Sequence, residues 1–238
     1  MYSYQSRIRY SELDEKGHLK LEALLDHFQD CSTFHSEDLG FGVDYLLKNH
    51  IIWVMSSWQI VVERYPVLGE RVTIATAPYD FKGFIGFRNF WVLDEAGERI
   101  ACANSIWTLL NTETGRPVKP NDDILNAYAL SPALDMEYAP RRISVPEGLE
   151  MGESVQIKKH HLDTNHHVNN GQYVRIAMDS LNRDCKIRQL RAEYKRQVVL
   201  GDTLTPWIAE TEDQKIVVVL KDQADSICCI VELETEKE

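Results

Sequence analysis

The 238-residue chain lacks several features that would place a protein in a special class. It contains no apolar run of about 18 residues and so offers no candidate for a membrane-spanning helix. Its first residues include no apolar core of the length that a signal peptide needs, and we therefore expect a cytoplasmic protein. The five cysteines are odd in number and form no CxxC pair, which favours reduced thiols over a disulfide framework.

Basic residues are scarce as well. The chain has 26 Lys and Arg against 37 Asp and Glu, and its net charge of −11 argues against nucleic acid as a partner. The segment 183–196 is an exception in which basic residues outnumber acidic ones. They are Arg183, Lys186, Arg188, Arg191, Lys195 and Arg196, against Asp184 and Glu193. Both a solvated strand face and a landing site for an acidic partner fit this pattern.

Two segments have the apolar periodicity of a helix. In residues 19–40, the apolar positions i, i+3, i+4 and i+7 are Leu21, Leu24, Leu25 and Phe28. Gly40 is a fitting residue to end this helix. In residues 169–183, one helical face carries Tyr173, Ile176, Ala177, Ser180 and Leu181. Asn169 or Asn170 can cap the start of this second helix.

Most of the remaining chain is rich in β-branched and aromatic residues and predicts strands. The predicted strands are 51–65, 70–81, 84–94, 99–111, 202–211, 215–222 and 226–234. Turn sequences at 94–99 and 221–226 indicate antiparallel neighbours. Residues 113–150 differ, because they hold five of the eight prolines and few periodic apolar positions. We interpret this stretch as a linker laid along the surface.

The two halves of the chain resemble each other. Residues 11–30 align without gaps on residues 160–179, so that Asp14 matches Asp163 and His18 matches His167. Further on, both halves contain a Leu-Gly-acidic turn, at residues 68–70 and 200–202. The pattern indicates a tandem duplication of an α+β unit. We expect each half to be a long helix wrapped by a curved antiparallel sheet, with the two sheets pairing side by side as a pseudo-dimer.

The segment 160–174, HHLDTNHHVNNGQYV, gathers unusual polar chemistry in front of the second helix. Its possible metal ligands are His160, His161, Asp163, His166 and His167. Their spacing matches neither HExxH nor a Cys/His finger, so we expect no metal. An ordinary capped turn with solvated histidines is one alternative, and a catalytic loop is the other.

The catalytic interpretation is based on the pattern D-x-N-x-H-x-N-N at a helix start. Asp163 could hold or activate a water molecule or attack directly, His167 could orient the site or move a proton, and Asn165 could donate a hydrogen bond. Free N–H groups at the helix start would stabilise negative charge that develops on a carbonyl oxygen. The chain has no GxSxG nucleophile elbow, and the loop has no cysteine.

At these residues the chain closely resembles the acyl-acyl carrier protein thioesterases, the tandem hot-dog family of bacteria and plant plastids. Residues 163–170 stand as D-T-N-H-H-V-N-N, which is similar to the D-x-N-x-H-V-N-N motif of the plant members. The first half resembles bacterial members in segments 28–42, 53–66, 81–98 and 111–120. The resemblance implies a double hot-dog fold and the release of free fatty acid from the thioester of a carrier. It also implies an acyl tunnel mainly in the N-terminal half, and no cofactor.

The catalytic Asp, Asn and His of the family map onto Asp163, Asn165 and His167. The chain departs from the plant pattern in one place, where Gln197 and Val198 stand instead of a Glu followed by a Cys. Because an amide does not accept a proton near neutral pH, Gln197 cannot be a general base. We therefore assign the role of base or nucleophile to Asp163, as in the similar hydroxybenzoyl-CoA type of thioesterase. Gln197 could still orient water.

The resemblance predicts an N-terminal hot-dog over 1–130, a linker over 131–150 and a catalytic C-terminal hot-dog over 151–238. The expected substrate-binding residues are Trp53, Met55 and Trp58, together with Asn169 and Asn170 of the loop. For each of the first three taken alone, packing in the core is the commoner role of such a residue in a strand. The expected docking residues for an acidic acyl carrier protein, whose phosphopantetheine arm would carry the acyl chain, are Arg188, Arg191, Lys195 and Arg196. Either a monomer or a homodimer fits the duplication.

Three alternatives stay open at this point. An acyl-CoA thioesterase would use the same residues. A hot-dog dehydratase would need a His facing an acid across the pseudo-dimer and would yield an enoyl product. A non-catalytic acyl-binding module is favoured by Gln197, because that residue cannot replace the missing base.

Overall fold

The structure is a computed structural model that describes residues 1–181, 185–211 and 213–236. The chain divides into two compact units. The first comprises Met1–Ser56 and Ile60–Tyr138, and the second comprises Ser57–Gln59 and Ala139–Glu238. Within the described ranges, no helix is both long and apolar enough to cross a membrane.

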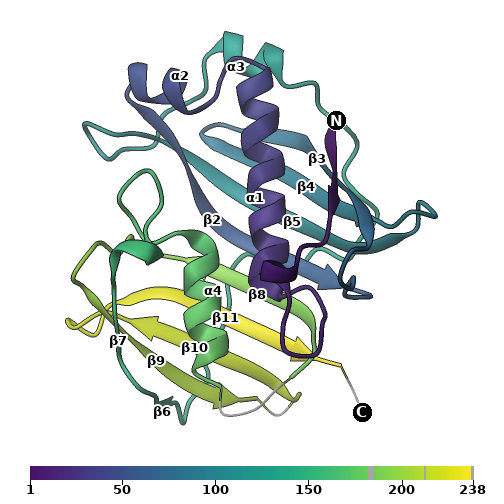
Figure 1. The fold of residues 1–238 in the computed structure, drawn as a ribbon. Helices are drawn as coiled ribbons and strands as arrows, with labels where there is room; N and C mark the ends of the chain where they lie inside the picture. The colour runs from purple at the N-terminus through teal and green to yellow at the C-terminus, as the bar shows by residue number, and fades with distance from the viewer. Residues whose placement is uncertain (182–184, 212, 237–238) are drawn as a thin grey trace. The chain divides into compact units, whose positions relative to one another are not determined.

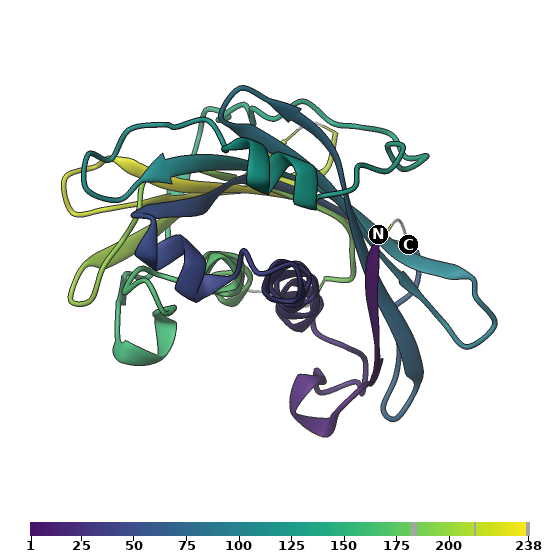
Figure 2. The same ribbon diagram turned by 90° about the horizontal axis from the view of Figure 1, so that it is seen from above.

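The first unit has five strands arranged around one long helix, α1 (Leu21–Asp38). Its strands follow the order β1-β3-β4-β5-β2. Their bounds are β1 (Tyr2–Arg7), β2 (Ile51–Val62), β3 (Arg71–Lys82), β4 (Ile85–Leu93) and β5 (Arg99–Asn111). Three short helices complete the unit: η1 (Tyr10–Glu12), α2 (Val43–Lys48) and α3 (Asp122–Ala127). Figure 1 shows α1 in front of these strands, and Figure 2 shows it end-on within their curve.

The amphipathic pattern of α1 explains this position. The predicted apolar face is buried in the structure, with Leu25 and Phe28 fully inaccessible to solvent. The ring of Phe28 lies 5.3 Å from that of Phe90 on β4. The helix stops at Asp38, and Gly40 follows with a φ of +81°, a conformation that costs glycine little. The predicted first helix is therefore confirmed, with its end two residues before Gly40.

The second unit repeats the plan with a shorter helix, α4 (Asn170–Asp179). Its strands follow the order β8-β11-β10-β9-β6, and β7 also pairs with β9. Their bounds are β6 (Glu150–Met151), β7 (Val155–Gln156), β8 (Ile187–Tyr194), β9 (Thr203–Glu210), β10 (Lys215–Lys221) and β11 (Ile227–Thr235). The short helix η2 (Lys159–His161) precedes the polar loop. As Figure 1 shows, α4 lies across this sheet, against β10 and β11.

The second predicted helix forms, but it is shorter than its pattern indicates. Asn169 is its N-cap and Ser180 its C-cap, so Leu181 lies beyond it. Tyr173, Ile176 and Ala177 are buried on its inner face as expected. The last predicted positions, Asn182 and Arg183, lie outside the described residues, as does Asp184.

All seven strands predicted from composition are present, and both turn sequences join antiparallel strands. The stretch 113–150 is not entirely a linker, because α3 forms within it. Asn121 caps this helix by accepting a hydrogen bond from the amide of Ile124 at 2.9 Å. The run Asn121-Asp122-Asp123 is a helix-start signal that the proline content of the stretch obscured.

The remainder of the predicted linker divides between the units. Tyr138 donates to Asn89 of the first unit at 3.0 Å. In the second unit, Ile143 is 5% exposed and packs on Val217, Val219 and Ile230. Part of this stretch therefore lies on the sheet of the second unit, with Ile143 in the core of that unit.

Candidate active site

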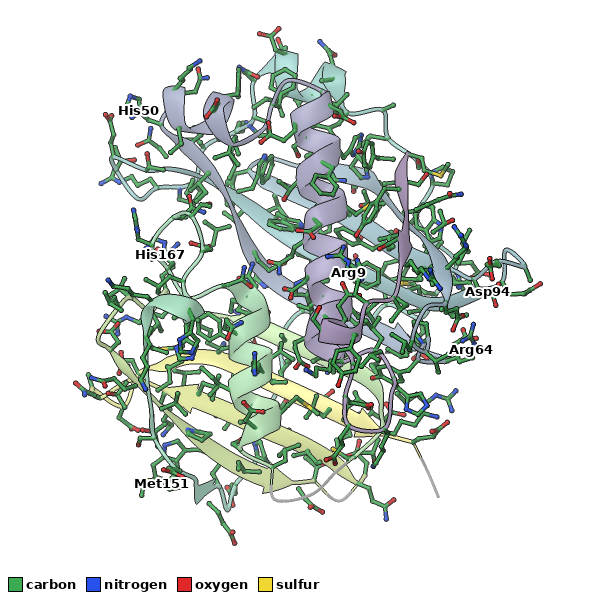
Figure 3. The ribbon with its side chains drawn as sticks, viewed as in Figure 1. Arg9, His50, Arg64, Asp94, Met151 and His167 are labelled. Atoms are coloured by element: carbon green, nitrogen blue, oxygen red, sulfur yellow. The ribbon has the colours of Figure 1, made fainter. Side chains whose placement is uncertain are left out.

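The loop between η2 and α4 is a short, tightly bonded turn. Leu162 and Val168 pair as an isolated antiparallel bridge, and the amide of Asp163 donates to the carbonyl of His167 at 2.8 Å. His166 adopts a φ of +62°, in the left-handed region, to close the turn. Figure 3 labels His167 on this loop.

Asp163 organises the turn through one carboxylate oxygen. Its Oδ1 accepts hydrogen bonds from the amides of Asn165 at 2.8 Å and His167 at 3.3 Å. Asp163 and His167 are half-buried, whereas Asn165 is exposed. The structure therefore brings the three predicted catalytic residues together within a single turn that solvent can reach.

A distant segment lies beside this turn. The amide of Val168 donates to the carbonyl of Val198 at 2.9 Å, and His167 pairs with Val199. Gln197 is exposed at the position just before Val198. The backbone thus brings Gln197 near the Asp163 turn, and a role for Gln197 in orienting water stays a prediction.

Two tyrosines, Tyr173 buried and Tyr194 half-buried, hold this arrangement, and sequence reasoning did not assign them that role. Tyr194 donates to the carbonyl of Asn170 at 3.0 Å, and Tyr173 donates to the carbonyl of Arg196 at 3.4 Å. Their rings meet edge to face at 5.6 Å. Burial raises the pKa of both phenols, so both remain neutral donors. In the sequence, Tyr173 follows the 163–170 motif and Tyr194 lies just before Gln197. Their proximity in space becomes visible only in the folded chain.

The start of α4 has a partial positive charge but is already capped. Asn169 Oδ1 accepts from the amide of Gly171 at 2.8 Å, and its carbonyl accepts from the amide of Gln172 at 2.9 Å. A substrate oxygen at this helix end would have to compete with Asn169 for these amides. The Asn169 side chain therefore has a structural role as well as the predicted role in binding.

The histidines of the segment do not form one cluster. His161 is 9% exposed, and its Nδ1 accepts from the amide of Lys158 at 3.0 Å. Burial, followed by the neighbouring charge of His160, lowers the pKa of His161. Among residues 1–181, 185–211 and 213–236, no three His, Cys, Asp or Glu side chains are grouped so as to hold a metal ion.

The first unit contains the same turn. Asp14 Oδ1 accepts from the amides of Lys16 at 2.9 Å and His18 at 2.8 Å. The amide of Leu19 donates to the carbonyl of Pro66 at 2.9 Å, as Val168 does to Val198. Holding the turn is therefore a role that both aspartates share. The neighbouring side chains differ between the two turns. Asn165 and Asn169 stand near Asp163 where the first unit has Lys16 and Lys20.

The predicted docking residues have different environments. Arg191 is largely buried, pairs with Glu232 at 2.8 Å and donates to the carbonyls of Pro140 and Arg142, so it anchors the linker. Lys195 pairs with the buried Glu193 at 2.9 Å. Arg196 is 59% exposed beside Asp222, and Arg188 is exposed. Arg188 and Arg196 are thus the better placed to meet a partner, and Arg183 lies outside the described residues.

The predicted tunnel residues lie on β2. Met55 and Trp58 are each 2% exposed, and Trp53 is half-buried with its ring 6.1 Å from that of Phe81. Trp58 belongs to the second unit, whereas Trp53 and Met55 belong to the first. Met55 and Trp58 therefore pack as core residues, and contact of any of the three with an acyl chain stays a prediction.

Comparison with known proteins identifies a family that covers most of the chain. Residues 1–128 match the acyl-ACP thioesterase N-terminal domain, and residues 149–235 match the acyl-ACP thioesterase C-terminal domain. A chloroplastic acyl-[acyl-carrier-protein] hydrolase from Cuphea viscosissima is 27% identical over 83% of this chain and 51% of its own length. The chain spans about half the length of such plant relatives.

Solved structures show the same fold. The crystal structure of an acyl-ACP thioesterase from Bacteroides thetaiotaomicron is 26% identical, with a TM-score of 0.90 over 98% of this chain and 97% of that one. A 12:0-ACP thioesterase from Umbellularia californica shares the fold at 22% identity, with a TM-score of 0.87 over 100% and 97% of the chains. The predicted tandem hot-dog fold class is confirmed, and the chain belongs to the acyl-ACP thioesterase family.

Proposed function

We propose that this chain hydrolyses the thioester of acyl-acyl carrier protein and releases free fatty acid. The observation that carries the proposal is the Asp163 turn at the start of α4, in a member of this family. The names of the plant relatives, which are acyl-carrier-protein hydrolases, support the substrate class. A cytoplasmic location is part of the proposal, supported by five free cysteines, although those plant relatives are chloroplastic.

In the proposed reaction, water attacks the thioester carbonyl carbon. Asp163 draws the proton from this water, and Gln197 holds the water from the opposite side by hydrogen bonding. The developing oxyanion is stabilised by Asn165, by His167 and by the positive end of α4, where one well-placed donor is worth about 3 kcal/mol. Asp163 then gives this proton to the sulfur as the C–S bond breaks, which yields the carboxylic acid and the thiol and returns Asp163 to its carboxylate form.

The test exploits the duplicated turn. In Asp163→Asn the amide oxygen can still accept from both backbone amides, so the turn is kept while the charge and the base are lost. We expect thiol release from acyl-carrier-protein substrates to fall by about a hundredfold or more. Asp14→Asn changes the matched turn in the first unit and should leave the rate unchanged. A loss of less than about tenfold in Asp163→Asn would contradict the role of Asp163.

Gln197 favours one alternative, a module that binds acyl chains without turnover. That reading would be supported by tight acyl binding with no thiol release, and Gln197→Glu would then be expected to restore activity. Competition by free acyl carrier protein distinguishes carrier-linked substrates from acyl-CoA. An enoyl product without thiol would instead indicate a dehydratase.

A further inference from the structure

The face of β4 that is turned toward α1 carries a buried cation. Side chains alternate along a strand, so Arg88 is on the same face as Phe90, whose ring meets that of Phe28 on α1. Arg88 Nη1 donates to His35 Nδ1 on α1 at 3.1 Å and to Thr76 Oγ1 on β3 at 3.2 Å. Both partners are neutral acceptors, which satisfy Nη1 but supply no negative charge.

No carboxylate compensates the charge of Arg88. Among the described residues, the groups near it that could become negative are the phenol of Tyr128 and the thiol of Cys31. Burial raises the pKa of the Cys31 thiol to about 12, so the thiol is neutral near pH 7, as a phenol is. A guanidinium stays protonated in a protein, and an isolated charge is costly to bury. Arg88 thus differs from Arg191, which is also largely buried but pairs with Glu232.

Two further nitrogens of Arg88 are free to donate. Within residues 1–181, 185–211 and 213–236, its hydrogen bonds leave from Nη1, and Nε and Nη2 have no partner. Neither nitrogen belongs to the unbonded side-chain atoms that are sealed from solvent. Arg88 keeps 8% of its surface accessible, whereas its neighbours Thr76 and Phe90 keep none. Water therefore reaches the unbonded edge of this guanidinium.

Aromatic rings form a wall beside Arg88. The Tyr128 ring lies 5.4 Å from the guanidinium carbon and 6.1 Å from the ring of Phe81. The Phe81 ring in turn lies 6.1 Å from that of Trp53. Gly86, two residues before Arg88 on β4, makes room for these rings. A Cβ added at Gly86 would come within 3.1 Å of Phe81 and 3.3 Å of Trp53. An aromatic lining with few polar groups is typical of small-molecule sites.

We propose that the interior of the first unit binds an alkyl carboxylate, with the carboxylate on Nε and Nη2 of Arg88 and the chain along the rings of Phe81 and Trp53. These two nitrogens form the edge of a guanidinium that donates two parallel bonds, which matches the geometry of a carboxylate. The ligand supplies the anion that the chain itself does not place beside Arg88.

Such a carboxylate has two sources, and both rest on the proposed function. One is the free fatty acid, which is the product of that reaction. The other is the far carboxylate of a dicarboxylic acyl chain, in which case Arg88 determines substrate specificity.

The test is a titration of the full chain with decanoate, followed by the ¹H–¹⁵Nε signal of Arg88, which is assigned by its disappearance in Arg88→Met. This signal should shift and saturate. In calorimetry, Arg88→Met should weaken decanoate binding at least about tenfold. Arg71→Met removes an exposed arginine of the same unit and should leave the affinity unchanged. A buried ion replaced by an apolar side chain is often neutral or stabilising, so Arg88→Met should fold.

A comparison of ligands needs no variant. Decanol should bind the unchanged chain at least about tenfold more weakly than decanoate, because it lacks the charge that Arg88 meets. The proposal is overturned if the Arg88 signal stays unmoved at saturating decanoate. It is equally overturned if Arg88→Met and Arg71→Met bind decanoate alike, or if decanol binds as tightly as decanoate.

Hydrolysis of N-acetylcysteamine thioesters distinguishes the two sources. If the ligand is the free product, decanoate should inhibit thiol release, and Arg88→Met should relieve this inhibition about tenfold. If it is a dicarboxylic acyl chain, the half-thioester of decanedioic acid should have a higher kcat/KM than the decanoyl thioester, and Arg88→Met should remove this preference. Because decanoate binding is measured without turnover, a chain that binds decanoate but hydrolyses no thioester would refute the proposed function alone.

Discussion

At the scale of single residues, the interior of the first unit holds an unusual pair. Arg88 is 8% exposed and donates to His35 Nδ1 at 3.1 Å and to Thr76 Oγ1 at 3.2 Å. The face of the Tyr128 ring lies 5.4 Å from the guanidinium carbon. These neutral acceptors satisfy the buried cation only while His35 remains unprotonated, because a protonated imidazole has no lone pair to offer.

This contact predicts a pH dependence of stability. Burial, and then the charge of Arg88, lower the pKa of His35 from 6.5 to about 4. A depressed pKa means that the contribution of His35 is fully present above pH 6.5 and is lost as the pH falls toward 4. The shift corresponds to about 3 kcal/mol.

We expect urea unfolding to show this loss between pH 6.5 and 4 in the unchanged chain. His35→Asn keeps an acceptor near Nδ1 but does not titrate there, so its free energy of unfolding should fall less steeply over the same interval. The comparison uses slopes, because the smaller side chain also leaves a cavity that lowers stability at every pH. Parallel slopes for the two proteins would contradict the assignment.

At the scale of elements, the N-cap residue of α4, Asn169, lies directly after the candidate catalytic turn and also stabilises the helix. The Asn169 side chain accepts a hydrogen bond from the amide of Gly171, and loss of such a cap costs about 1 kcal/mol. Asn169→Ala should lower the free energy of unfolding by about this amount, whereas Asn169→Asp keeps an acceptor and adds a charge that the helix end favours. Denaturant unfolding measures both. Equal losses in the two variants would show that the side chain does not act as a cap.

The linker is a second element whose role the fold reveals. Its carbonyls bind Arg191, and the amide of Ile143 donates to the buried Glu193 at 3.1 Å. Arg191 and Glu193 of β8, which both lie in the basic segment, therefore bind the backbone of the linker. A loss of activity on changing Arg191 would mix a folding defect with any docking defect, which makes Arg188 the better residue to test.

At the scale of the whole molecule, charge should govern the encounter with the carrier. The net charge is −11, so an acidic partner is repelled except near the basic segment. With carrier-linked substrate, kcat/KM should fall as salt is raised through about 0.1 M, where the screening length is about 10 Å. Arg188→Glu should lower kcat/KM for this substrate several-fold and weaken its salt dependence.

The controls for this prediction are a substrate and a variant. An acyl thioester of N-acetylcysteamine has neither carrier nor phosphate, so its hydrolysis should be unaffected by Arg188→Glu. Arg71→Glu changes an exposed arginine of the first unit by the same charge and should have little effect. If both variants slow carrier-linked turnover equally, the net charge of the chain and not a local docking surface controls the reaction.

The sequence by itself determined what depends on local pattern. The periodicity of residues 21–28 and the alternating β-branched runs predicted α1 and the strands, because burial of one face follows from spacing along the chain. The matched Asp14 and Asp163 segments predicted two similar turns, which the structure contains. The residues of the candidate turn could also be named in advance, since they fall within five positions of one another.

Only the tertiary structure decided what depends on contacts between distant segments. It placed Gln197 beside the turn through the Val168–Val198 bond and set Tyr194 beneath Asn170. It also directed His161 Nδ1 to the backbone amide of Lys158. The physical reason is that a residue type specifies which bonds a side chain can make, whereas strand register and helix length select the partner that lies within reach.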